Sequence, residues 1–208
     1  MIGKDLGIGA YWDALAKTLA AVDLSEIEQL SQMIHDAYDA GRTVFVCGNG
    51  GSAATASHLC EDLAKGTLHE AEMLNRDDLK RLKVLSLTDN GPWITAISND
   101  LGYEHVFVQQ LIHFAQPGDL LIAISGSGNS PNIVRAVDWA NAHGLQTFGM
   151  TGFEGGTLRR IATAGLHAPV DDMGLTESVH GCVIHWVVDD LLARFNHCGR
   201  HAPMARAA

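Results

Sequence analysis

The stretch that most limits how this chain can fold is 44–66, where a short apolar run leads through a glycine turn into a series of small residues. The apolar residues 43–47 are typical of a buried strand. The three glycines in 48–51 allow a tight turn, and Ser52 is a good N-cap for a helix. This pattern predicts a strand–turn–helix unit whose unpaired backbone amides favour an anion, although an ordinary turn of a doubly wound sheet has the same signature.

The alternation of strand and helix continues along the chain to about residue 170. Apolar runs bounded by glycine, proline and asparagine predict the strands, and amphipathic segments between them predict the helices. Such alternation is typical of the α/β class, and we expect a doubly wound, mostly parallel five-stranded sheet flanked by helices. The expected strands are 43–47, 82–87, 120–124, 146–150 and 166–170.

Two further helices, 10–22 and 24–40, are predicted before the first strand from their apolar spacing. Such a helical hairpin often packs against another subunit, although packing within the chain is equally consistent with the pattern. The charged stretch 67–80 is predicted to be a mobile surface segment, in which His69 and Glu70 are more readily explained as loop residues than as site residues. Residues 196–208 are expected to form a frayed tail.

A second glycine-rich turn, SGSGNSPN at 125–132, follows the third expected strand and precedes a helix. Ser125, Ser127 and Ser130 supply hydroxyl groups, and Gly126 with its neighbouring glycine lets backbone amides approach the same point. The stretch lacks the lysine of a nucleotide P-loop and the spacing of a dinucleotide site. We therefore expect it to hold an oxyanion such as a phosphate.

Two helices carry residues suited to metal binding or proton transfer. His58 and Asp62 lie four residues apart on the helix that follows the first turn, so their side chains share a face. Glu177 and His185 lie on one stripe of the last helix, predicted at about 176–195. A histidine in such an apolar helix is more often a hydrogen-bonded packing residue, so the pattern alone leaves both interpretations open.

Composition excludes several classes of function. The formal net charge is −10, which argues against general nucleic-acid binding because that draws on clustered Lys and Arg. No apolar run approaches the length of a membrane span and the first residues do not have the order of a secretory signal, so we expect a soluble, cytoplasmic protein without membrane partners. The four cysteines have unrelated spacings, and three lie in apolar segments, which predicts reduced core residues.

Taken together, these motifs resemble the sugar isomerase (SIS) domain and, within that family, the phosphoheptose isomerases, which interconvert sedoheptulose 7-phosphate and D-glycero-D-manno-heptose 7-phosphate. The resemblance implies one SIS domain over 1–195, with a helical hairpin at 1–41 and an α/β core at 42–195. It also implies a homotetramer with active sites at subunit interfaces. The matching motifs are GNGGSAA before His58, ISNDLGYEHVF at 97–107, PGDLLIAISGSGNSPN, MTGFEGG, and a last helix whose motif ends at His185.

The resemblance also implies roles for individual residues. Substrate contacts would come from the first turn, from an Asn-Asp pair and from the serine loop, which would hold the phosphate. One zinc ion per subunit would lie between the two helices. The implied substrate-binding residues are Asn49, Gly50, Gly51, Ser52, Asn99, Asp100, Ser125, Gly126, Ser127, Ser130 and Glu177, and the implied metal ligands are His58, Asp62, Glu177 and His185.

Four positions differ from the family pattern. Asp62 replaces the glutamate that usually serves as base, and Glu177 replaces a glutamine. Gly66 and Gly174 stand where the family has an arginine and an aspartate. These changes surround the expected pocket. They affect the prediction of which sugar binds more than the prediction that the ligand carries a phosphate.

The leading hypothesis is an aldose–ketose isomerase of a sugar phosphate that works through an enediol. Asp62, or Glu61 if the helix is rotated, would act as the carboxylate base, and His185 would act as the opposing acid. The alternative is a non-catalytic SIS protein that binds a phosphosugar or a protein partner, like the relatives that associate with replication initiators. The metal content of the protein distinguishes the two.

Overall fold

The computed structural model describes residues 2–68 and 74–203 of the chain. Within these residues, five strands form one sheet in the order β2-β1-β3-β4-β5, and all neighbouring strands are parallel. The α/β class and the doubly wound sheet are confirmed. The strand order reverses between β1 and β3, where such sheets bind ligands. The strands are β1 (Thr43–Gly48), β2 (Lys83–Ser86), β3 (Leu120–Ile124), β4 (Gln146–Thr151) and β5 (Ala164–His167).

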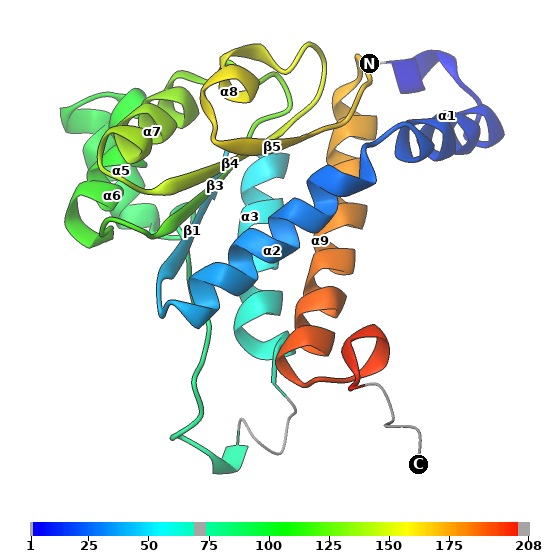
Figure 1. Cartoon of the computed structure of the whole chain (residues 1–208). Coiled ribbons are helices and arrows are strands. Elements are labelled where there is room, and N and C mark those ends of the chain that lie inside the picture. The colour runs from blue at the N-terminus through cyan, green and yellow to red at the C-terminus, as the bar shows by residue number, and fades with distance from the viewer. Residues whose placement is uncertain (1, 69–73, 204–208) are drawn as a thin grey trace, which may run out of the picture.

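Helices cover both faces of the sheet (Figure 1). α2, α3 and α9 pack on one face, and α5, α6, α7 and α8 pack on the other. The helices are α1 (Ile8–Ala20), α2 (Leu24–Asp39), α3 (Gly51–Gly66), α5 (Gly91–Asp100), α6 (Val108–Phe114), α7 (Pro131–Ala142), α8 (Gly156–Ile161) and α9 (Met173–Phe195), with short 3-10 turns η1 (Ile2–Asp5), η2 (Tyr103–His105) and η3 (Gly199–His201).

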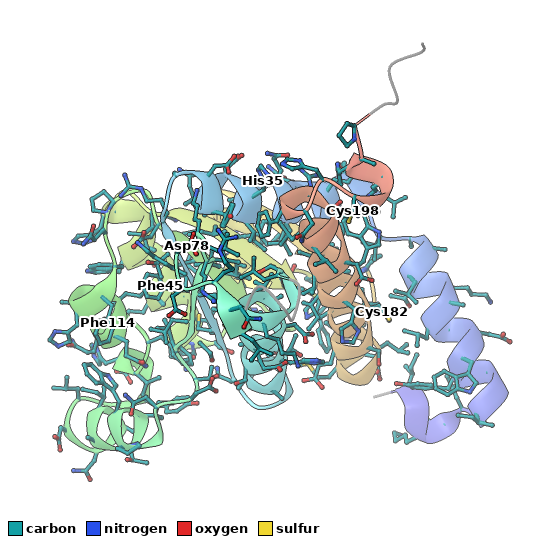
Figure 2. All side chains as sticks on the ribbon, turned by 90° about the horizontal axis from the view of Figure 1, so that it is seen from below. His35, Phe45, Asp78, Phe114, Cys182 and Cys198 are labelled. Carbon is teal, nitrogen blue, oxygen red and sulfur yellow. The ribbon has the colours of Figure 1, made fainter. Side chains whose placement is uncertain are left out.

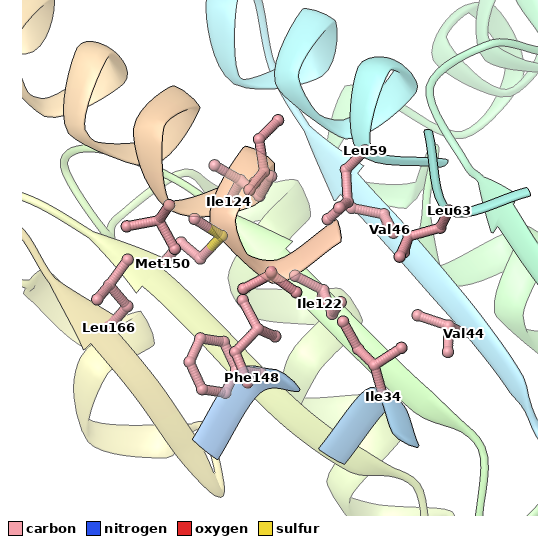
Figure 3. Close-up of a cluster of buried hydrophobic side chains, with 14 of the residues drawn as sticks. Ile34, Val44, Val46, Leu59, Leu63, Ile122, Ile124, Phe148, Met150 and Leu166 are labelled. Carbon is pink, nitrogen blue, oxygen red and sulfur yellow. The ribbon is translucent and has the colours of Figure 1, made fainter. Parts of the chain in front are cut away.

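The first strand shows why the sheet is buried on both sides. Val44 and Val46 belong to the apolar cluster beneath α2, α3 and α9, whereas Phe45 and Cys47 belong to the cluster beneath the other helices. Successive side chains of a strand point to opposite faces, so a continuous apolar run supplies both clusters. Figure 3 shows the first cluster, with Phe148 among the residues in it.

The two leading helices pack differently. α2 lies on the sheet and places Leu30 and Ile34, which are fully buried, in the core. α1 instead makes its main contacts with α9 and extends away from the sheet (Figure 1). Its outer side leaves Ile8 and Trp12 69% and 57% exposed. The second helix is therefore part of the α/β body, and the first leaves two large apolar side chains uncovered.

The described part of the C-terminal segment folds back onto α9, so the prediction of a frayed tail is wrong for residues 196–203. Arg200 Nε and His201 Nε2 each lie 2.8 Å from Oδ1 of Asp190, a buried carboxylate on α9. The Arg200 guanidinium also lies 4.4 Å from the centre of the Trp186 ring. A buried carboxylate needs such donors, and the tail supplies them.

The four cysteines fall into two groups. Cys47 and Cys60 are buried, as expected, whereas Cys182 and Cys198 are exposed, which corrects the prediction of a core position for Cys182 (Figure 2). Cys182 lies on the solvent side of α9 despite the apolar residues around it in the sequence. Burial, with a smaller contribution from Asp89, raises the pKa of Cys60 to about 12, so this thiol stays protonated.

Two remaining expectations concern surface segments and membranes. Within 67–80, residues 69–73 lie outside the described residues, so the interpretation of His69 and Glu70 as loop residues stays a prediction. Among the described residues, no helix combines the length and the apolar character that crossing a membrane requires.

Candidate active site

Glycine shapes the turn between β1 and α3. A Cβ at Gly48 would collide with the backbone of Ser52, and Gly50 has a φ of +56°, which side chains rarely adopt. Gly50 is the N-cap, so α3 begins two residues earlier than a Ser52 cap would allow. Ser52 instead lies in the first helical turn, whose backbone N–H groups have no partners within the helix.

The serine loop after β3 is held by the turn after β4. Gly152 N donates to Gly126 O and Leu158 N donates to Gly128 O, both at 2.8 Å. Gly128 has a φ of +66°, and a Cβ there would collide with the carbonyl of Gly155. The loop is therefore fixed in place rather than a flexible turn, and it leads into α7 at Pro131.

These two loops and the start of α9 enclose a pocket of about 270 Å³ at the carboxyl ends of β1 and β3. No lysine or arginine of the described residues lines it, so an anion bound there would be held by backbone amides and hydroxyl groups. Nine of its lining residues were predicted as substrate-binding residues from the sequence. The lining residues are Asn49, Gly50, Gly51, Ser52, Ile124, Ser125, Gly126, Ser127, Ser130, Met173 and Glu177.

A larger hollow of about 760 Å³ lies between α6 and α7, with Ile112, Arg135 and Trp139 among its lining residues. It contains none of the predicted site residues and does not reach the glycine turns. Ligand sites of doubly wound sheets form at the reversal of strand order, so the smaller pocket is the candidate site.

Glu177 lies at the wall of this pocket, in the first turns of α9. That helix begins at Met173, three residues earlier than predicted, because Asp172 accepts a hydrogen bond from Leu175 N and caps it. The Glu177 carboxylate lies so close to Gly51 that a Cβ at Gly51 would overlap it. A side chain at Gly51 would therefore push the Glu177 carboxylate away from the first turn of α3.

Further along the same two helices, His58, Asp62 and His185 form a group in which one donor atom from each residue lies within 4.8 Å of the others. His58 Nε2 lies 3.2 Å from Asp62 Oδ2, and the rings of His58 and His185 are 5.0 Å apart, centre to centre. Among the described residues, this is the only cluster of His, Cys, Asp or Glu with metal-binding geometry. Glu177, the fourth predicted ligand, is not in the cluster.

Glu61 and Asp62 face different directions on α3. Glu61 forms an ion pair with Lys65 on the solvent side, and this hydrogen bond lowers the pKa of the Glu61 carboxyl. Asp62 instead faces the two histidines, with its side chain 21% exposed. Of the two carboxylates considered as base from the sequence, Asp62 is the one that the structure brings to His185.

Asn99 and Asp100 lie at the end of α5, where Asn99 Nδ2 donates to Asp100 Oδ1 at 2.8 Å. Both side chains are exposed, and neither lines the pocket. Tyr103, which follows them, contacts a residue of the pocket wall: its hydroxyl donates to Asn49 Oδ1 at 2.9 Å. Sequence reasoning did not single out Tyr103 or Asn132, although both lie within the motifs that it used.

Two polar residues on the buried side of α9 face the same loops. His180 is 1% exposed and its Nε2 lies 3.2 Å from the Thr151 carbonyl, while its Nδ1 and the Thr176 hydroxyl have no partner within the described residues. Burial is the main cause that lowers the pKa of His180 to about 4, with a smaller contribution from His167. This histidine is therefore a neutral packing residue, whereas His185 is exposed and free to bind.

Comparison with known proteins identifies the family. The sequence profile described as the SIS domain matches residues 10–152. The phosphoheptose isomerase of Akkermansia muciniphila is 37% identical over 186 residues, which cover 88% of this chain and 90% of that protein. A probable phosphoheptose isomerase of Thermoplasma volcanium is 34% identical over 184 residues and covers the same shares.

Solved structures agree with these sequence matches. The phosphoheptose isomerase of Neisseria gonorrhoeae superposes with a TM-score of 0.79 at 25% identity, over 88% of this chain and 96% of that one. Both the sequence and the fold therefore align over most of their length. The chain belongs to the SIS domain family, and within that family it groups with the proteins named phosphoheptose isomerase.

Proposed function

We propose that the protein is an aldose–ketose isomerase that interconverts sedoheptulose 7-phosphate and D-glycero-D-manno-heptose 7-phosphate. The observation that carries this proposal is that the pocket and the His58–Asp62–His185 group lie along the same two helices. By helical rise, His58 lies about 9 Å beyond Ser52, and His185 about 12 Å beyond Glu177. An open-chain sugar with a phosphate at one end and a carbonyl at the other fits such a separation, and relatives named phosphoheptose isomerase support the seven-carbon substrate.

The phosphate would bind at the pocket end of the site. Two helices, α3 and α7, begin there, and the first N–H groups of a helix favour negative charge. Ser125, Ser127 and Ser130 would add hydroxyl donors. This arrangement suits a protein with a net charge of −10, because it attracts a phosphate locally without a basic surface.

His58, Asp62 and His185 are suited to hold one zinc ion per chain. Two imidazole nitrogens and one carboxylate oxygen are common zinc ligands, and three protein ligands with a remaining open position are typical of catalytic sites. When bound, the metal would supply a Lewis acid for the sugar carbonyl. We place Glu177 on the substrate side, because its carboxylate lies against Gly51 and not with the three ligands.

Proton transfer would involve Asp62 and His185. Isomerisation removes a proton from the carbon next to the carbonyl and returns one to the neighbouring carbon, through an enediol. Asp62 Oδ2 faces His58, so we propose that Oδ1 accepts the carbon-bound proton. His185, across from it on α9, would donate a proton to the carbonyl oxygen, which becomes a hydroxyl, and would accept the proton of the neighbouring hydroxyl as the new carbonyl forms there.

The proposal extends to the whole chain as one SIS domain over 1–195 that assembles into a homotetramer. The apolar side of α1, with Ile8 and Trp12, supports assembly because a large exposed apolar surface on a helix favours a partner. The His58 side chain is 50% exposed, which leaves room for a neighbouring subunit to complete the site.

The test is to follow the conversion of purified sugar phosphates by NMR. We expect the heptulose 7-phosphate to be converted faster than pentulose and hexulose phosphates, which share its phosphate and carbonyl but differ in length. Unchanged spectra for all three would refute the isomerase. If the unchanged sugar still binds, the non-catalytic phosphosugar-binding protein would be the better assignment.

A further inference from the structure

The side chain of Asn49, at the wall of the pocket, is held by two residues that do not line it. Asn49 Nδ2 donates to Asn132 Oδ1 at 2.9 Å, and Asn132 Nδ2 donates back to Asn49 Oδ1 at 2.8 Å. The Tyr103 hydroxyl donates to the same Asn49 Oδ1 at 2.9 Å. Three segments that are distant in sequence therefore meet at one amide.

The orientation of both amides is fixed by the backbone of α7. Asn132 is 1% exposed, and its Oδ1 accepts a hydrogen bond from Ile133 N at 3.0 Å. A backbone N–H can only donate, so the atom facing it must be the oxygen of Asn132. The Asn132 nitrogen must then face Asn49, and it can only pair with the oxygen of Asn49.

The same bonds decide what Asn49 can offer to a ligand. An amide oxygen has two lone pairs, and those of Asn49 Oδ1 are taken by Asn132 and Tyr103. Its Nδ2 carries two hydrogens, of which one is used by Asn132. The remaining N–H makes Asn49 a donor only, suited to a hydroxyl or carbonyl oxygen of the ligand.

We infer that Tyr103 and Asn132 are positioning residues that hold Asn49 as a fixed hydrogen-bond donor to an oxygen of the bound sugar. This inference rests on the proposed sugar-phosphate isomerase function. It also gives a role to the segment around Asn99 and Asp100: Tyr103, three residues after Asp100, links that segment to the turn after β1.

The test is a double-mutant cycle between Tyr103→Phe and Asn49→Ala. Tyr103→Phe removes only the hydroxyl, so we expect KM for sedoheptulose 7-phosphate to rise about 3- to 10-fold with little change in kcat. In the Asn49→Ala background the same change should have no further effect. Tyr38→Phe is the matched control, because the Tyr38 hydroxyl faces the Lys80 carbonyl away from the pocket.

Some variants will turn over too slowly for KM to be measured. For these, calorimetry measures the affinity for the equilibrated mixture of ketose and aldose, and the affinities are compared with and without Asn49 in the same way. Asn132→Leu, which keeps the shape of the side chain but neither donates nor accepts, should also weaken binding only when Asn49 is present. Equal losses in both Asn49 backgrounds, or no loss in Tyr103→Phe, would overturn the inference. Wild-type protein that fails to turn over the sugar would instead contradict the proposed function.

Discussion

Asp62 and Glu61 are adjacent residues with the same chemistry, yet they face different surroundings on α3. Asp62 lies beside His58, and Glu61 pairs with Lys65 on the solvent side. Consecutive residues on a helix are about 100° apart, so only one of the two can face α9. α3 is in close contact with α9, and this contact brings Asp62 near His185.

This geometry predicts different outcomes for two isosteric substitutions. Asp62→Asn removes the proposed base, which is also a proposed metal ligand, so we expect kcat to fall at least 100-fold. Glu61→Gln should change kcat less than about 2-fold, because an exposed pair with Lys65 contributes little. Steady-state kinetics on the two variants shows which carboxylate acts as base. A larger loss of kcat in Glu61→Gln than in Asp62→Asn would assign that role to Glu61.

His180 predicts a pH dependence of stability. Its pKa of about 4 in the folded protein is below the ordinary value of 6.5, so the unfolded chain takes up the proton first as the pH falls. The contribution of neutral His180 is fully present above pH 6.5 and is lost progressively between pH 6.5 and about 4. By linkage the wild type should lose roughly 2 to 3 kcal/mol through this residue by pH 4.5.

Urea unfolding of the wild type and of His180→Gln at several pH values measures this contribution. Between pH 6.5 and about 4, the unfolding free energy of the variant should decrease less than that of the wild type, whatever the stability of the variant at pH 7. Parallel curves for the two proteins would show that His180 is not held neutral by burial.

At the scale of elements, α9 joins the site to the C-terminal segment. Its first turns carry Glu177 at the pocket, its middle carries His185, and Asp190 anchors the residues that follow the helix. Burial alone would raise the pKa of Asp190, but hydrogen bonds from Ser31, His201, Arg200 and Arg194 outweigh it and hold the pKa well below its ordinary value.

Replacing Asp190 should therefore destabilise the fold. Asp190→Ala leaves two arginines without their carboxylate, and we expect a loss on the order of 3 kcal/mol in unfolding free energy. Because the pKa of Asp190 is lowered, this contribution is present above about pH 3.8 and is lost only as the pH falls further, below the range of His180.

The matched control is Asp189→Ala, which removes an exposed carboxylate from the next position of α9. Denaturant melts of the two variants at pH 7 give the comparison. Equal and small effects would mean that the C-terminal segment does not depend on Asp190.

At the scale of the whole molecule, α1 predicts assembly. Replacing Ile8 and Trp12 with serine removes exposed apolar surface, so we expect the mass in solution to fall from that of a tetramer. Light scattering coupled to size exclusion measures this, with Lys17→Ser on the same helix as the control. An unchanged mass would place the subunit contacts elsewhere.

The overall fold could be predicted because its determinants are local. The apolar run of β1 and the glycines at 48–51 specify a strand, a turn and a helix within a few residues. The serine loop was recognisable for the same reason, and nine predicted residues do line one pocket.

The remaining features depend on contacts between distant segments. Asn49 and Asn132 are 83 positions apart, and no periodicity relates them. The short polar tail showed no pattern that would reveal its attachment to Asp190, and the apolar neighbours of Cys182 concealed its exposed position. Helix rotation separated Asp62 from Glu61, and two turns of α9 separate Glu177 from the cluster of His58, Asp62 and His185.

The central claim is that the phosphate pocket and the His58–Asp62–His185 group work together in a metal-dependent isomerase. Its most direct test is the turnover of sedoheptulose 7-phosphate before chelation, after complete removal of metal, and after one equivalent of zinc is restored. We predict that turnover is lost on chelation and regained with zinc. Undiminished turnover by the metal-free protein, or none by the zinc-loaded protein, would contradict the claim.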